Sequence, residues 1–81
     1  MLVALYATAA APTSTTATSA WTPPTGTTER YDRWTPTTAS FKISVEAATV
    51  AQATAGATGT KVATGPSGGS PVGQLLALNP A

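Results

Sequence analysis

The chain has 81 residues and carries four basic and three acidic side chains, which leave a formal net charge of +1. So few basic residues exclude an electrostatic surface for nucleic acid, which needs clustered Lys and Arg. No apolar stretch approaches the ~20 residues of a membrane-spanning helix. Histidine and cysteine are absent, which excludes disulfides and the usual zinc ligands as supports of a small fold.

Two strands are predicted in the first half of the chain. Residues 1–8 form an apolar run that is typical of a buried strand. Residues 9–20 are rich in Ala, Thr and Ser and are expected to form a loop. Two consecutive prolines within residues 21–26 predict a turn, because proline cannot donate to a strand ladder. Residues 27–34 then predict a short strand with four of the charged side chains.

The clearest strand pattern covers residues 40–46, where apolar and polar residues alternate. Every second side chain of a strand lies on the same face. We expect the apolar face to be buried, and it comprises Phe41, Ile43 and Val45. The other face, with Lys42 and Glu46, is expected to be exposed, because a slip of one residue would reverse the faces at a large cost.

The second half of the chain has a weaker pattern. Residues 50–57 and 59–64 each allow a loop or a partial strand, and a short helix over residues 45–54 is an alternative that the alanines favour. Residues 65–71 are expected to form a Gly/Pro/Ser loop. Residues 72–78 predict a last apolar strand, which we expect inside the sheet like the first strand, with direct pairing between the two as one arrangement.

These segments predict an all-β fold, either a small antiparallel β-sandwich or a partial jelly-roll-like sheet of five to six strands. Large apolar side chains are scarce, because Leu, Ile, Val and Phe total 12 residues whereas Ala and Thr total 17 each. A core of this composition needs outside support. We therefore expect residues 1–81 to be a single β domain that is a fragment or C-terminal module of a larger chain, or a subunit that neighbouring chains complete.

Three blocks of sequence resemble a recurring module. They are WTPPTGTTERYD at residues 21–32, AGATGT at residues 55–60, and GQLLAL at residues 73–78, which Pro80 follows. The pattern resembles the second half of a β-sandwich module of actinobacteriophage virion proteins and actinobacterial surface proteins. The resemblance implies a structural or receptor-facing role, a virion-surface or extracellular location, and other virion or surface-protein subunits as partners. It transfers no catalytic residue.

Residues 29–34 are the one chemically rich segment. Regular alternation places Glu29, Tyr31 and Arg33 on one face and Arg30, Asp32 and Trp34 on the other. Each face then combines an acid, a base and an aromatic ring, a set that can hydrogen-bond to sugar hydroxyls and stack on a sugar ring. The favoured interpretation is that these charges protect the edge of the sheet and form ordinary surface ion pairs. Trp21 and Trp34 are likewise favoured as core-capping residues over a binding platform. The candidate glycan or partner contacts are Trp21, Arg30, Tyr31, Asp32 and Trp34.

Catalytic chemistry has little support in this sequence. Glu29 and Asp32 are the nearest approach to a carboxylate pair, but alternation places them on opposite faces and no histidine or cysteine is present to tune them. We expect no enzyme activity, no cofactor and no metal. The sequence favours a non-enzymatic structural module of a bacteriophage virion, such as a decoration, fibre or tail-associated subunit, that forms a homo-oligomer. The alternative is a carbohydrate-binding or adhesion module on a tail fibre or bacterial surface.

Overall fold

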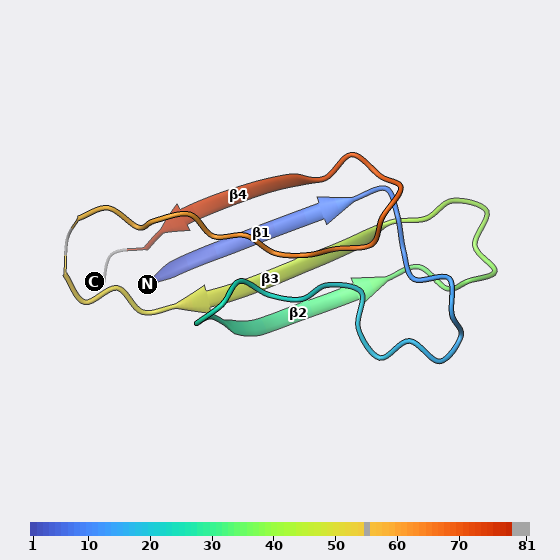
Figure 1. Ribbon diagram of the computed structural model, residues 1–81, viewed down its shortest axis with the longest axis horizontal. Coiled ribbons are helices and arrows are strands. Elements are labelled where there is room, and N and C mark those ends of the chain that lie inside the picture. Colours follow the sequence, from blue (N-terminus) through green and yellow to red (C-terminus); the bar gives the residue numbers. More distant parts are fainter. Residues whose placement is uncertain (55, 79–81) are drawn as a thin grey trace.

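The computed structural model describes residues 1–54 and 56–78, and within these ranges it contains one β-sheet and no helix (Figure 1). The strands are β1 (Leu2–Thr8), β2 (Thr28–Trp34), β3 (Ser44–Val50) and β4 (Val72–Ala77). The expected all-β class is confirmed, and the described residues form a single antiparallel sheet of four strands instead of five or six. Ala55 and Pro80, which belong to the blocks of the resemblance, lie outside the described residues.

The strand order is β2-β3-β1-β4, so β1 lies inside the sheet between β3 and β4. β1 pairs antiparallel with both neighbours along nearly its whole length. The first and last strands are therefore adjacent, and the prediction of an interior strand is correct for β1. For β4 the prediction is wrong, because β4 forms an edge and all six of its residues are exposed. No other described segment pairs with its outer side.

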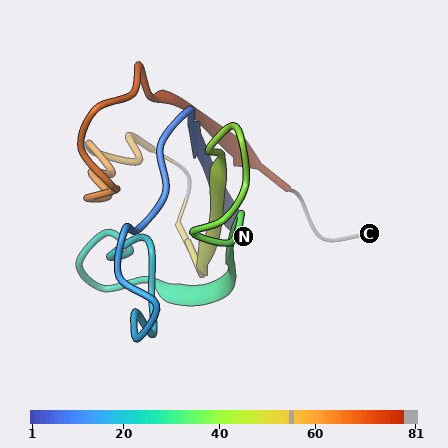
Figure 2. The same ribbon diagram turned by 90° about the vertical axis from the view of Figure 1, so that its right-hand side faces the viewer.

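Two long connections lie on the same side of the sheet (Figure 2). The first connection, residues 9–27, joins β1 to β2, and the third connection, residues 51–71, joins β3 to β4. Thr22 and Thr64 link the two connections through backbone hydrogen bonds with N···O distances of 2.7 and 3.0 Å. We call the side of the sheet beneath these connections the covered face and the other side the open face.

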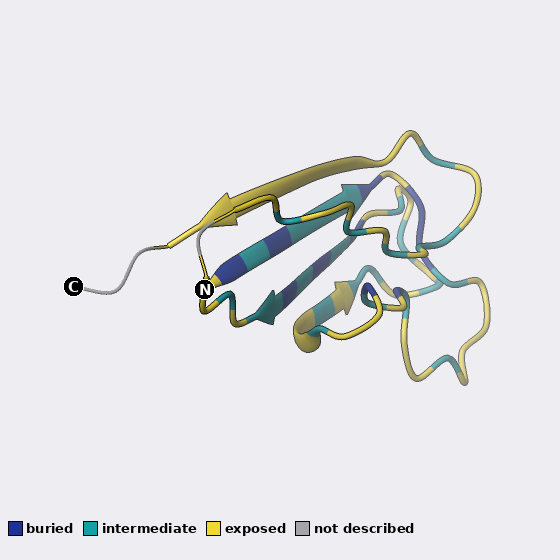
Figure 3. Cartoon of the chain, turned by 60° about the vertical axis from the view of Figure 1, so that its left-hand side comes forward, coloured by how far each residue is buried: buried dark blue, intermediate teal, exposed yellow. Residues whose placement is uncertain are grey.

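The core lies between the covered face and the two connections. Its bulkiest side chain is Trp21 of the first connection, which is 4 % exposed and whose ring centroid lies 5.7 Å from that of Tyr6. The other buried hydrophobic residues are mostly alanines: Leu2, Ala4, Ala10, Ala11 and Ala48. Figure 3 shows burial alternating along β1 and β3, whereas β4 is exposed along its length.

The predicted faces of the third strand are reversed. β3 begins at Ser44, four residues later than expected. On the face that was expected to be buried, Phe41 is 72 % exposed, Ile43 is exposed and Val45 is half-buried. On the face that was expected to be exposed, Lys42 is half-buried and Glu46 is buried.

The reversal follows from the contact between Trp21 and Ser44. The indole N–H of Trp21 donates a hydrogen bond to Ser44 Oγ with an N···O distance of 3.0 Å, so Ser44 must face the core. Alternation then directs Ile43 and Val45 to the open face. Small side chains at Ser44 and Ala48, both fully buried, also leave room for the indole ring above the sheet.

The weakly patterned segments contribute little regular structure. Residues 59–64 supply only the bridge at Thr64, and the described part of residues 51–57 contains no strand. The alternative helix over residues 45–54 is wrong, because its first half belongs to β3. Residues 9–20 and 65–71, which were predicted as loops, contain no strand.

Candidate functional site

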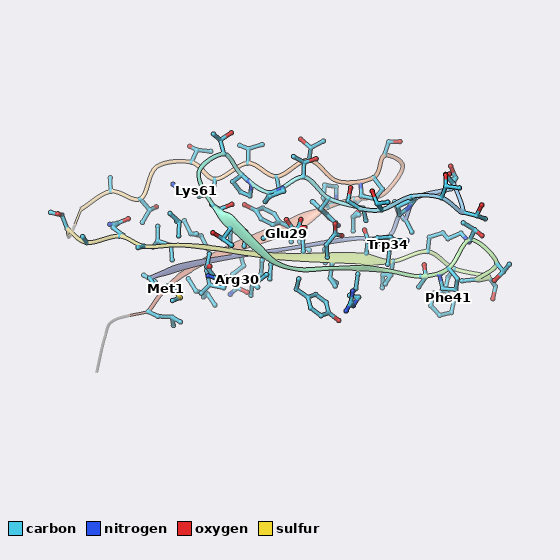
Figure 4. The ribbon with its side chains drawn as sticks, turned by 90° about the horizontal axis from the view of Figure 1, so that it is seen from below. Met1, Glu29, Arg30, Trp34, Phe41 and Lys61 are labelled. Atoms are coloured by element: carbon cyan, nitrogen blue, oxygen red, sulfur yellow. The ribbon has the colours of Figure 1, made fainter. Side chains whose placement is uncertain are left out.

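A β-bulge in β2 decides where its charged side chains point. Glu29 pairs with β3, but the next residue that pairs is Tyr31, so Arg30 is an extra residue in the strand. The extra residue inverts the alternation that follows it, and Glu29 and Asp32 consequently share the covered face. The expectation that these two acids lie on opposite faces is wrong. Figure 4 shows Glu29 and Arg30 on opposite sides of the sheet.

The bulge gathers all three acidic residues of the chain in one place. Glu29 and Asp32 come from β2, and Glu46 comes from β3 directly opposite Asp32. One carboxylate oxygen from each residue lies within 4.8 Å of the other two. Glu29 is exposed, Asp32 is half-buried and Glu46 is 2 % exposed. We call this group the acidic cluster.

Glu46 is the member of the acidic cluster with the least favourable surroundings. Neither oxygen of its carboxylate accepts a hydrogen bond from a donor of the protein. Burial raises the pKa of Glu46 from 4.5 to about 8, and a hydrogen bond with Glu29 and the charges of Glu29 and Asp32 add to the increase. A buried carboxylate among like charges needs either a proton or a cation to compensate it. A proton shared with Glu29 is one such arrangement.

Asp32 has backbone partners that fix its orientation. Its Oδ2 atom accepts hydrogen bonds from the backbone N–H of Ala20, at 3.1 Å, and of Trp21, at 3.3 Å. These bonds also join the first connection to β2. Because each carboxylate oxygen has further lone pairs, Asp32 keeps acceptor capacity that faces the acidic cluster.

The basic side chains are engaged elsewhere. Arg30 Nε donates to Thr49 Oγ1 at 2.9 Å, and the Arg33 guanidinium lies 5.4 Å from the centre of the Tyr31 ring, both on the open face. The two lysines donate to backbone carbonyls of their own loops, Lys42 to Thr37 and Ala39 and Lys61 to Thr58. Within residues 1–54 and 56–78, none of these cations forms a salt bridge with the acidic cluster.

The candidate contact residues from the sequence do not form one surface. Trp21 is a core residue, and Asp32 and Trp34 are half-buried on the covered face. Arg30 and Tyr31 are exposed on the open face. The sheet therefore separates the candidates into two groups. Glu46 is absent from these candidates, because the strand pattern of residues 40–46 predicts an exposed position for it.

The open face is the second notable surface. Among the described residues no backbone segment covers it, and Figure 4 shows the long connections only on the other side of the sheet. An open concavity of about 620 Å³ lies over its centre. The side chains that register places on this face along β1, β3 and β4 are mostly apolar: Val3, Leu5, Ala7, Val45, Ala47, Thr49, Val72, Gln74 and Leu76.

Comparisons with protein-family models, characterised proteins and solved structures find no match to this chain. Among the described residues there is no helix that is long and apolar enough to cross a membrane.

Proposed function

We propose that this chain is a non-enzymatic structural module that a second copy completes, with the two open faces packed together as a two-layer β-sandwich. The observation that carries this proposal is the open face itself. A sheet usually has at least one face packed in a core and exposes polar side chains on the other face. Here Val3, Leu5 and Val45 occupy the centre of the face without cover from the described chain.

The charge distribution supports a second copy as the partner. Along β1 and β4 the open face has no charged side chain, and Arg30 and Arg33 lie at its margin on β2. A net charge of +1 produces little repulsion between copies. An uncharged apolar surface can pack on its own copy around a twofold axis, which is the commonest symmetry of homo-oligomers. Two such faces would lie about 10 Å apart, as in other sandwiches.

The setting of this module is proposed from the sequence blocks at residues 21–32, 55–60 and 73–78. Their resemblance implies a structural or receptor-facing role at a virion or cell surface. A role as a decoration, fibre or tail-associated subunit agrees with a module that depends on its neighbours. Carbohydrate binding has less support, because Trp21 is buried and Trp34 lies on the other side of the sheet from Tyr31.

Two lysine substitutions test the proposal. Leu76 is 39 % exposed on the open face, and Val62 is 69 % exposed in the third connection. We expect light scattering after size exclusion to show a dimer for the wild type and for Val62→Lys, and loss of the dimer for Leu76→Lys at the same concentration. The reason is that the dimer would bury the introduced ammonium group without a partner. A folded wild-type monomer, or equal behaviour of the two variants, would reject the open face as the interface.

A further inference from the structure

We propose that Glu29, Asp32 and Glu46 form a calcium-binding site on the covered face of the sheet. This inference is independent of the assembly proposed above, because the open face takes no part in it. The three carboxylates have oxygen atoms within 4.8 Å of one another. A single cation can contact ligands that are this close together, since Ca²⁺ binds oxygen atoms at 2.3–2.6 Å.

Glu46 provides the observation that distinguishes this group from an ordinary acidic patch. Only 2 % of Glu46 is exposed, and neither oxygen of its carboxylate accepts a hydrogen bond from a donor group of the described residues. The hydrogen bond with Glu29 forms only when one of the two carboxyl groups holds a proton. Most buried polar atoms have a partner, so two orphaned oxygens on one carboxylate require an explanation. One of them lies within 4.8 Å of an oxygen of Glu29 and of Asp32, where a bound cation would supply the missing interaction.

The distribution of charge also favours a cation site at the acidic cluster. All three acids of the chain meet in the acidic cluster, and the two arginines that neighbour them in β2 point to the open face. The lysines donate to backbone carbonyls instead. Three carboxylates therefore lie together without a basic side chain among the described residues to balance them. A divalent cation compensates most of this charge.

The ligand atoms favour calcium over other metals. Every side-chain donor in the acidic cluster is a carboxylate oxygen, and the chain has no histidine or cysteine for zinc or copper. Magnesium requires near-octahedral geometry and keeps several waters, whereas calcium accepts irregular sets of oxygen ligands. One ligand here is almost fully buried and another is fixed by backbone N–H groups, which suits a cation that sheds most of its water.

Solvent can reach the site through a small depression. Its volume is about 260 Å³, and its lining comprises Thr18 and the six residues 29–34, which include Glu29 and Asp32 as well as Arg30 and Arg33. Glu46 is not part of this lining and is almost fully buried, whereas Glu29 is exposed. An ion from solvent therefore has direct access to Glu29.

Metal titration of the full 81-residue chain tests this inference. Ca²⁺ binding is measured by calorimetry and as a rise in melting temperature relative to a chelator, with Mg²⁺ as the comparison. Tb³⁺ serves as a luminescent substitute for Ca²⁺, because the indole ring of Trp21 donates to Ser44, two residues from Glu46 on the covered face, and can act as a sensitiser. We expect sensitised Tb³⁺ emission that Ca²⁺ displaces.

Two isosteric variants and one control complete the experiment. Glu46→Gln and Glu29→Gln should each weaken Ca²⁺ affinity by at least about tenfold, a loss that even the supporting partners of metal ligands usually produce. Arg33→Gln, on the open face, should bind Ca²⁺ like the wild type. Glu29 is exposed, so its substitution keeps the fold intact. The proposal is overturned if the wild type shows neither a melting shift nor Tb³⁺ emission, if Glu46→Gln binds equally well, or if Mg²⁺ binds more tightly than Ca²⁺.

Discussion

Trp21 is the residue on which the packing of this small core depends. Its ring contacts Tyr6 and its N–H is satisfied by Ser44. A buried tryptophan side chain removes about 150–250 Å² of its surface from water. The small side chains of the surrounding alanines cannot bury as much. The third connection passes close to the ring at Gly65, where an added Cβ would lie 2.7 Å from Trp21 Cζ3. The lack of a side chain at Gly65 therefore allows the connection to close over the indole.

Substitution of Gly65 should disturb this packing directly. We expect Gly65→Ala to lower the free energy of unfolding by about 1–3 kcal/mol, because the new methyl group overpacks the site against Trp21. The control is Ser67→Ala, at an exposed position of the same connection. It should change the free energy of unfolding by less than about 0.5 kcal/mol. Denaturant unfolding measures both. Equal stability of the two variants would contradict the close contact at Gly65.

Glu46 links stability to pH when a chelator keeps divalent cations away. Its pKa is about 8 in the folded chain and near 4.5 when unfolded, so the folded state holds the proton more tightly. The contribution of Glu46 to stability is therefore greatest below about pH 4.5 and is lost as the pH rises towards 8. Denaturation midpoints across this range should decrease for the wild type and stay nearly constant for Glu46→Gln. A wild-type midpoint that rises between these pH values would contradict the burial of an unpaired carboxyl group.

At the scale of elements, the two edges of the sheet are protected unequally. β2 has a bulge, four charged side chains and the side-chain contact of Asp32 with the first connection. Bulges and charges are the usual devices that prevent edge-to-edge pairing. β4 has no charged residue and no proline, and its six residues are exposed. It is therefore the least stabilised strand of the sheet.

Amide hydrogen exchange should reveal this difference in stability between the strands. We expect the slowest exchange in β1, which has a hydrogen-bonded neighbour on each side, and the fastest strand exchange in β4. Residue-resolved exchange followed by NMR makes the comparison within one sample, so β1 serves as the internal reference. Protection of β4 equal to that of β1 would mean that another strand pairs with its outer side, contrary to the face-to-face arrangement proposed here.

The sequence predicted the positions of the strands better than it predicted which face of each strand is buried. Local features, namely apolar runs between Pro/Gly-rich turns, located β1, β2 and β4 to within one residue at each end. β3 was misplaced because its register depends on the hydrogen bond between Trp21 and Ser44, which are 23 residues apart. The acidic cluster could not be predicted either, because it needs both the extra residue Arg30 in β2 and the inward orientation of Glu46.

At the scale of the whole molecule, the chain forms an elongated body of 45 × 22 × 22 Å that covers one side of its own sheet. The covered face is stabilised by one tryptophan, small side chains and backbone contacts between the connections. The open face exposes aliphatic side chains that a second sheet would bury. A small domain without disulfides gains much of its stability from such a partner. The proposed dimer therefore predicts that the single chain is not stable on its own in solution.

Sedimentation equilibrium of the wild-type chain at micromolar concentrations tests this point most directly. We predict one folded species with twice the 8.0 kDa mass of a single chain, and a melting temperature that rises with protein concentration because dissociation and unfolding are linked. A folded species of 8.0 kDa with a cooperative melt that does not depend on concentration would contradict the account, because the single chain would then be stable with its open face in water.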